Sequence, residues 1–248
     1  MIDVRTHDDY VAGHLAGALP VPVADLPQQV VPLDKEKPTL VYCHQGALSQ
    51  AAAKVLARAG FEQVYYLRDG FESWQYGVSS GSPEDACGDL VNLDSAVEQA
   101  ELAWQIEEAA RFFYLEMSKS IEDPDIASLF AELVVAEEQH KTTLKALWEG
   151  LAGLPADNDF PGGSSSDDQV MEGGLSLKEA LDRASRSRPA QIIDYAMAME
   201  LNAYDQYLYL QRNSTDPDSQ RLFEVMADEE RHHLKTLARS LEKLNRQA

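Results

Sequence analysis

The chain has 248 residues, more than one average domain, so we expect two domains. Its formal net charge of -21 leaves no basic surface for phosphates, which excludes nucleic acid as an expected partner. No apolar run approaches the ~18 residues that a membrane span needs, and the first residues lack the charged-then-apolar pattern of a secretion signal. We therefore expect a cytoplasmic protein with no membrane partner.

The first part of the chain alternates short β-like runs with a helical one. The β-like runs cover residues 1–5, 39–42 and 63–67, and an Ala-rich helix is predicted over 49–59. Strand, helix and strand in this order are typical of a parallel α/β unit. We assign residues 1–78 to this domain and residues 79–92, which begin with Ser, Gly and Pro, to a linker.

Residues 93–248 have a helical pattern and predict an all-α domain. The four expected helices cover 94–120, 124–149, 176–212, with a break near Pro189, and 217–246. Two of these helices start at an Asp-Pro pair, in which Asp caps the helix and Pro takes the first helical position. The Gly- and Ser-rich stretch 154–174 separates the second helix from the third. This arrangement predicts a four-helix bundle with a long crossover.

The helical part contains an internal repeat at a constant offset of 93 residues. Asp123-Pro124-Asp125 recurs as Asp216-Pro217-Asp218, so the repeated unit is a helical hairpin. The recurring pairs with polar side chains are Glu107 and Glu200, Tyr114 and Tyr207, Glu137 and Glu230, and His140 and His233.

The repeat carries a pattern that indicates metal binding. Glu and His three residues apart share one helical face, so each Glu-x-x-His points at one spot. The full set has four carboxylates and two imidazoles, which suit two iron ions or manganese. A single Glu-x-x-His is more often solvated surface. However, Glu107 and Glu200 lie in apolar runs, where an unpaired acid is expensive to bury.

Several neighbours of the predicted ligands have open roles. Tyr114 and Tyr207 are either core aromatics or hydrogen-bond donors to ligand carboxylates. We expect Glu138, Glu229 and His232 at the surface or behind the ligands.

The segment from 93 to 246 resembles the rubrerythrin family of ferritin-like proteins. The resemblance rests on Glu107…Tyr114, Glu137-Glu138-Gln139-His140, Glu200…Tyr207 and Glu230-Arg231-His232-His233. It implies a non-haem di-iron centre that reacts with peroxide or oxygen, an unknown electron donor and, by analogy, a homodimer. The chain departs from full rubrerythrin because the four cysteines of a rubredoxin module are absent. Ala203 also stands where the family has a further Glu.

Cys43 follows an apolar strand and precedes a helix. Such a loop turns several backbone N–H groups toward one point, which lowers a thiol pKa and can hold an anion. The alternative is a buried, inert cysteine. The substrate-binding loop would consist of His44, Gln45, Gly46, Ala47, Leu48 and Ser49. Cys87, the other cysteine, falls in the linker and is expected to be an exposed, incidental thiol, or alternatively the thiol that reacts next with the sulfur of Cys43.

Residues 1–77 resemble a rhodanese domain. The matching pieces are Ile2-Asp3-Val4-Arg5, Gly13-His14-Leu15-Ala16-Gly17-Ala18, the Cys43 loop, and Arg68-Asp69-Gly70-Phe71-Glu72-Ser73-Trp74. The resemblance implies that Cys43 carries a persulfide sulfur from a donor such as thiosulfate. Leu48 stands where many family loops have Arg, which removes one positive charge near the sulfur. We also expect an N-terminally short domain, because the family usually has a helix and a strand before the Asp-Val-Arg strand.

We therefore predict a sulfurtransferase coupled in one chain to a di-iron module that handles peroxide, oxygen or electrons. Its substrates would be small sulfur compounds. The competing hypothesis is a non-catalytic protein that binds a sulfur species and stores or senses iron. Leu48 and Ala203 favour this second hypothesis slightly.

Overall fold

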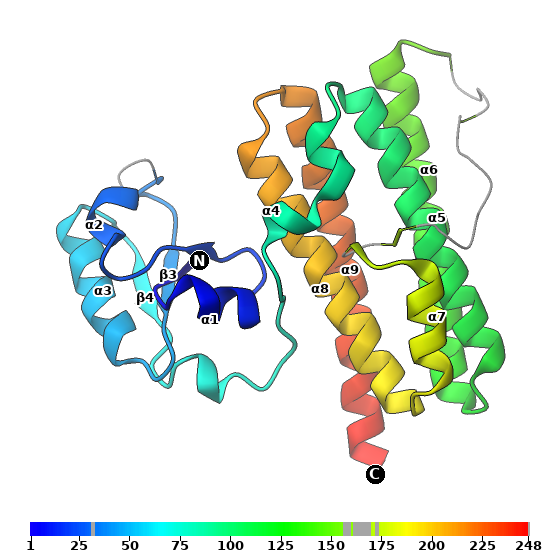
Figure 1. Ribbon diagram of the computed structural model, residues 1–248, viewed down its shortest axis with the longest axis horizontal. Coiled ribbons are helices and arrows are strands. Elements are labelled where there is room, and N and C mark those ends of the chain that lie inside the picture. Colours follow the sequence, from blue (N-terminus) through cyan, green and yellow to red (C-terminus); the bar gives the residue numbers. More distant parts are fainter. Residues whose placement is uncertain (31–32, 156–159, 161–169, 172–173, 248) are drawn as a thin grey trace. The chain divides into compact units, whose positions relative to one another are not determined.

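The computed structural model describes residues 1–30, 33–155, 160, 170–171 and 174–247. These form two compact units, Met1–Ser82 and Pro83–Ala248, called here the N-terminal unit and the helical unit (Figure 1). The division falls inside the predicted linker 79–92. Its later part forms the short helices α4 (Pro83–Ala86) and η2 (Gly88–Asn92), which belong to the helical unit.

The N-terminal unit is built on a parallel sheet with strand order β2-β1-β3-β4. The strands are β1 (Ile2–Asp3), β2 (Leu19–Pro20), β3 (Thr39–Tyr42) and β4 (Val64–Tyr66). Ile2 of β1 lies opposite Leu19 of β2 and Val41 of β3. The sequence did not predict β2, because a two-residue strand ending in proline shows no alternation.

Helices cover both faces of this sheet, as Figure 1 shows. The helices α2 (Leu26–Gln29) and α3 (Ala47–Arg58) pack on one face, and α1 (His7–Ala12) packs on the other. Successive residues of a strand point to opposite faces. Accordingly, Val41 and Cys43 join the core under α3, whereas Tyr42 joins the core under α1. A short 3-10 helix, η1 (Phe71–Ser73), follows β4. The predicted α/β class is confirmed.

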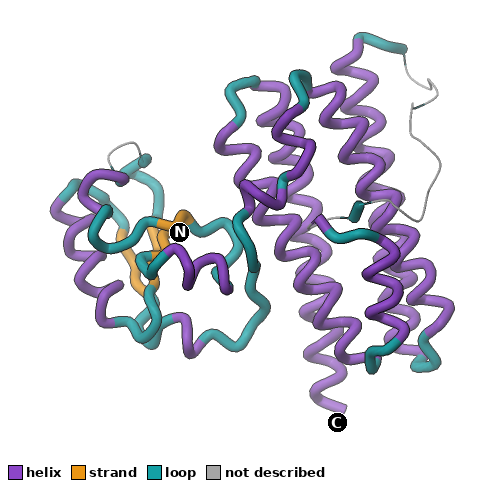
Figure 2. Tube along the Cα trace, viewed as in Figure 1, coloured by secondary structure: helices purple, strands orange, loops and turns teal. Residues whose placement is uncertain are grey.

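The helical unit is a bundle of four long helices with a shorter fifth helix beside it (Figure 2). The helices are α5 (Ala96–Ser120), α6 (Pro124–Ala152), α7 (Leu177–Ser185), α8 (Pro189–Asn213) and α9 (Pro217–Gln247). The predicted break near Pro189 is the boundary between α7 and α8. The predicted all-α class is confirmed. Most of the predicted crossover lies outside the described residues.

Side-chain caps explain where the bundle helices begin. Ser95 accepts a hydrogen bond from the Glu98 backbone at the start of α5. Asp123 accepts hydrogen bonds from two backbone N–H groups at the start of α6. Asp216 accepts one from the Ser219 backbone at 3.0 Å. Each cap satisfies N–H groups that have no partner inside the helix.

The apolar core of the bundle consists of two separate clusters. One contains Phe113 and Phe130, and the other contains Trp148 and Phe223. The predicted metal ligands lie between the two clusters along each long helix, so the bundle has a polar layer in its middle. Among the described residues, no helix combines the length and the apolar character needed to span a membrane.

Candidate sulfur-transfer and metal sites

The polar layer of the bundle brings the six predicted ligand side chains together. Each of them is at most 2% exposed, although four are carboxylates. Their potential ligand atoms form three groups, and within each group these atoms lie within 4.8 Å of one another. The groups are Glu137, His140 and His233; Glu107, His140 and Glu230; and Glu200, Glu230 and His233.

The two repeats make the same contacts within this layer. His140 Nδ1 lies 3.1 Å from Oε2 of Glu107, and His233 Nδ1 lies 2.9 Å from Oε2 of Glu200. The two imidazole rings stack with centroids 4.3 Å apart and an interplanar angle of 17°. The Nδ1 atoms of both stacked rings therefore face carboxylates.

The two tyrosines connect one repeat to the other. Tyr114 of α5 donates a hydrogen bond to Glu200 of α8. Tyr207 of α8 donates to Oε1 of Glu107 on α5, at 3.4 Å. Both hydroxyls are buried, so they hold two of the predicted ligand carboxylates while the rings fill the core. The two roles that the sequence left open for these tyrosines therefore occur together.

Electrostatics in the layer favour bound cations. Burial opposes protonation of His140, but hydrogen bonds to Glu107 and Glu229 outweigh it and raise the pKa of His140 to about 10. Burial likewise opposes ionisation of Glu200, but the charge of His233 and hydrogen bonds outweigh it and lower its pKa. Two imidazolium groups, if both formed, would balance only half of the negative charge of the four carboxylates. Metal ions would neutralise the remaining charge, and oxygen and imidazole donors fit iron or manganese.

One further carboxylate touches a predicted ligand. Oε2 of Glu229 lies 3.0 Å from Nε2 of His140, on the ring edge that faces away from Glu107. The hydrogen bond from His140 lowers the pKa of Glu229. The sequence predicted this glutamate either at the surface or behind the predicted ligands. The sequence contains one sign of a special role for Glu229, because the equivalent position of the first repeat is Ala136 and the carboxylate occurs only once.

In the N-terminal unit, the loop between β3 and α3 surrounds the sulfur of Cys43. The backbone N–H groups of Gly46 and Ser49 donate to its Sγ at 3.2 and 3.3 Å. Burial opposes ionisation of the thiol, but hydrogen bonds from Ser49 and Gly46 outweigh it and lower the pKa of Cys43. The Ser49 hydroxyl donates to the Gly46 carbonyl at 2.9 Å, which holds the first turn of α3 in place. The site therefore favours a thiolate.

Two glycines let this loop pack closely against the turn after β4. Gly46 and Gly70 have φ values of +91° and +72°, in the left-handed region that favours glycine. A Cβ on Gly46 would overlap the Arg68 carbonyl, and one on Gly70 would overlap the backbone of His44. The Phe71 N–H donates to the Cys43 carbonyl at 2.8 Å across this contact. The glycines thus position the cysteine.

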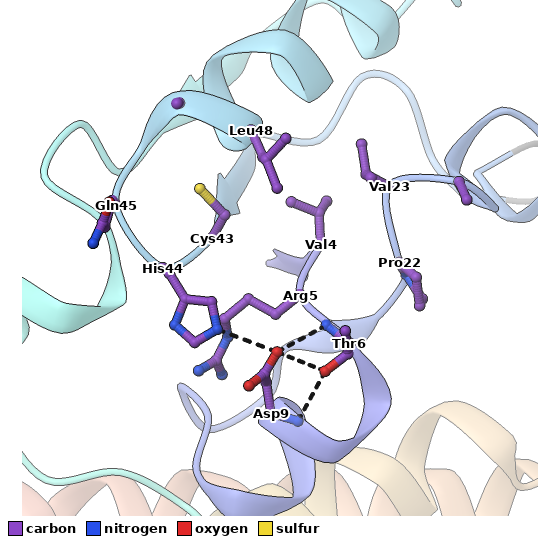
Figure 3. Close-up of a pocket in the computed structure, with 12 residues that line it drawn as sticks. Val4, Arg5, Thr6, Asp9, Pro22, Val23, Cys43, His44, Gln45 and Leu48 are labelled. Carbon is purple, nitrogen blue, oxygen red and sulfur yellow. Dashed lines mark hydrogen bonds and ion pairs between the residues drawn. The ribbon is translucent and has the colours of Figure 1, made fainter.

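The Cys43 sulfur lies beside a cavity of about 450 Å³ (Figure 3). Of the predicted loop, His44, Gln45, Ala47 and Leu48 line the cavity, whereas Gly46 and Ser49 contact the sulfur. The rest of the lining consists of residues that the sequence analysis did not predict for the site. They are Val4, Arg5, Thr6, Asp9, Pro22, Val23 and Ala24. They come from the loops after β1 and β2 and, for Asp9, from α1, so their distance from Cys43 along the chain gave no sign of this contact.

Cys87 differs from the sequence expectation. It is 3% exposed in the core of the helical unit, and its Sγ lies 3.9 Å from the carbonyl of Gln206. Burial raises its pKa to about 12. The expectation of an exposed thiol was wrong because α4 and η2 pack against the bundle, with Leu90 in the same core as Cys87.

Comparisons with known proteins identify the N-terminal unit. Residues 1–76 match the family model of the Rhodanese-like domain. Thiosulfate sulfurtransferase GlpE of Coxiella burnetii is 47% identical over 73 residues, which are 29% of this chain and 68% of that protein. The chain belongs to the rhodanese family. The rhodanese domain is also 37% identical over 76 residues to GlpE of Tolumonas auensis, covering 31% of this chain and 72% of that protein.

A solved Rhodanese_3-like domain from Anabaena is 33% identical to the rhodanese domain. The match covers 30% of this chain and 86% of that chain, with a TM-score of 0.29. In the helical unit, residues 191–248 match the Rubrerythrin family model. This match contains Glu200, Glu230 and His233. The chain thus fuses a rhodanese-like domain to a rubrerythrin-type region, as the two resemblances predicted.

Proposed function

We propose that the rhodanese domain is a sulfurtransferase in which Cys43 carries the transferred sulfur as a persulfide. The observation that carries this proposal is the pair of N–H donors from Gly46 and Ser49 on the Cys43 sulfur, beside an open cavity. The related GlpE proteins are named thiosulfate sulfurtransferases, which agrees with this chemistry.

The sulfur steps follow from this geometry. The Cys43 thiolate attacks the outer sulfur of a donor such as thiosulfate, the S–S bond of the donor breaks, and sulfite leaves with the bonding electron pair. The persulfide formed on Cys43 keeps one negative charge. The N–H groups that held the thiolate, with the positive end of the α3 dipole, can stabilise this charge. A thiolate acceptor then takes the outer sulfur and restores Cys43.

We further propose that the helical unit holds two iron ions, or manganese, between Glu107, Glu137, His140, Glu200, Glu230 and His233. When bound, the metal pair would supply oxidation–reduction chemistry with peroxide or oxygen, using electrons from a donor that is still unknown. The chain's own residues orient the ligands. Tyr114 and Tyr207 hold carboxylates on the opposite repeat, and the apolar clusters on both sides exclude water.

Storage or sensing of iron is the second candidate for the helical unit. Ala203 is 1% exposed and belongs to the apolar cluster beside the polar layer. This position, one turn after Glu200, therefore supplies no further carboxylate. The cytoplasmic location and the homodimer also remain predictions.

The full chain with Cys43→Ala tests the two modules separately. We expect thiosulfate-dependent sulfur transfer to a thiol acceptor, measured as sulfite release, to fall at least about 100-fold, as for loss of a covalent nucleophile. Metal analysis after anaerobic reconstitution should find about two ions per chain in both proteins. Undiminished sulfite release from the variant would refute the role of Cys43, and a metal-free reconstituted protein would refute the metal proposal.

A further inference from the structure

The cavity beside Cys43 is walled mainly by apolar side chains. Val4 and Leu48 flank the sulfur, and Pro22 and Val23 form the facing wall (Figure 3). Leu48 and Val23 are 52% and 39% exposed, so both present apolar surface to water beside the Cys43 sulfur. A donor bound to Cys43 would cover both of them.

The basic side chains that line the cavity, Arg5 and His44, already contact acids. Arg5 is buried, donates to Asp3 through two nitrogens and donates to the Gly13 carbonyl at 2.6 Å. Nε2 of His44 lies 3.2 Å from Oδ2 of Asp9. On its other side, Nδ1 of His44 lies 3.9 Å from Glu72. The backbone N–H groups at the sulfur can therefore stabilise one negative charge on a donor. The nearby carboxylates of Asp9 and Glu72 would repel a second one.

We infer that Cys43 takes sulfur preferentially from an organic sulfane donor whose inner sulfur carries an apolar group, rather than from the dianion thiosulfate. This inference rests on the proposed sulfurtransferase activity and names its donor class. The outer sulfur would lie at the Gly46 and Ser49 N–H groups. The apolar group would extend between Leu48 and Val23, where it removes exposed apolar surface from water.

The transfer step balances for this donor class. With an organic persulfide, the Cys43 thiolate bonds to the outer sulfur, the S–S bond of the donor breaks, and the organic thiolate leaves with the electron pair. With an organic thiosulfonate, the bond between the two sulfurs breaks in the same way, and an organic sulfinate leaves. Neither step needs an outside oxidant or reductant.

Benzenethiosulfonate and thiosulfate form a matched pair of probes. Both present an outer sulfur bonded to an oxidised sulfur, but a phenyl ring in the first replaces one charged oxygen of the second. With the full chain and a thiol acceptor, we expect kcat/KM to be roughly 10- to 100-fold higher for benzenethiosulfonate, as apolar pockets discriminate. Direct persulfide formation on Cys43, followed by mass spectrometry, provides a second measurement.

Leu48→Arg should shift this preference toward thiosulfate by about 10-fold or more, because it adds a cation and removes an apolar wall. Val23→Arg on the facing wall should shift it in the same direction. Val55→Arg is the matched control, because Val55 lies on the same helix, two turns from Leu48, and is 36% exposed. It adds the same charge outside the cavity lining and should leave the preference unchanged.

The outcomes separate this inference from the proposed function. A wild-type chain that turns over thiosulfate faster than benzenethiosulfonate would overturn the donor class alone. The donor class would also be overturned if Leu48→Arg and Val23→Arg showed the same preference between the two probes as Val55→Arg. A wild-type chain that turns over neither probe would overturn the proposed sulfurtransferase activity as well.

Discussion

His140 and His233 occupy equivalent positions of the repeat and stack on each other, yet their outer nitrogens meet different surroundings. Nε2 of His140 lies 3.0 Å from Glu229. Within the described part of the chain, no group hydrogen bonds the buried Nε2 of His233. The counterpart of Glu229 is Ala136, which has no polar side chain. The two halves of the candidate metal site therefore differ in the group that contacts the outer nitrogen of the histidine.

This difference predicts two unequal metal sites. A carboxylate at Nε2 fixes the tautomer of a histidine and leaves Nδ1 available as a ligand. Glu229→Gln should therefore weaken the binding of one of the two ions by roughly 10- to 100-fold. Anaerobic titration of the metal-free chain with Co(II), followed by absorbance, measures both affinities. Glu224→Gln, an exposed position on the same helix, is the matched control.

Ala136→Glu provides the reverse change. By the symmetry of the repeat, the new carboxylate would lie near Nε2 of His233, and the weaker site should gain affinity. Equal affinities in the wild-type chain, unchanged by Glu229→Gln, would contradict the prediction of unequal sites.

The two cysteines should react with iodoacetamide in very different pH ranges. Hydrogen bonds lower the pKa of Cys43 below its ordinary value of 9.0, whereas burial raises that of Cys87 to about 12. We expect only Cys43 to be alkylated at pH 7 to 8, with a rate that falls as pH drops through its lowered pKa. Peptide mass spectrometry locates the label. Alkylation of Cys87 first, or at an equal rate, would show that its thiol is accessible.

The same shift predicts how pH affects the stability of the rhodanese domain. A thiol whose folded pKa is lowered stabilises the folded state above the unfolded pKa, and this contribution is lost as pH falls through the folded pKa. Cys43→Ala should therefore flatten the dependence of the free energy of unfolding on pH in the range just below 9.0. Urea unfolding of both proteins at several pH values measures this effect.

Gly46→Ala should destabilise the rhodanese domain more than Gly81→Ala. Both glycines have left-handed φ values, +91° and +85°. A Cβ on Gly46 would overlap the Arg68 carbonyl, whereas nothing lies within 4 Å of one on Gly81. We expect Gly81→Ala to lower the free energy of unfolding by about 1 to 2 kcal/mol, because of the strained backbone alone, and Gly46→Ala to lower it by more. Thermal unfolding gives both values. Equal losses would mean that the loop moves away from Arg68 at little cost.

Metal removal should destabilise the helical unit, because the metal-free layer buries four carboxylates around two imidazoles. Ions at about 100 times their dissociation constant would add about 2.7 kcal/mol to the free energy of unfolding. Glu230→Gln removes one buried charge. The metal-free variant should be at least as stable as the metal-free wild type and should gain less from added ions. Thermal unfolding with and without chelator tests this, with the exposed Glu132→Gln as control.

The sequence alone predicted much of the helical unit, because its signals are local or repeated. Asp123 and Asp216 marked helix starts, since a cap acts on the next few residues. The offset of 93 residues predicted which six side chains converge in the polar layer, since an α-helix places residues three apart on one face. The glycine-containing loop after β3 likewise located the Cys43 sulfur at a helix start.

Only the tertiary structure decided the contacts between distant segments. No local pattern relates the parts of the chain that meet in three places. These are the hydrogen bond from Tyr114 to Glu200, the buried surroundings of Cys87, and the cavity wall at Val23. Glu229 and Ala136 differ in sequence, but the consequence for His140 depends on how α9 packs beside α6. Periodicity determines which face of a helix is buried, whereas packing determines what that face touches.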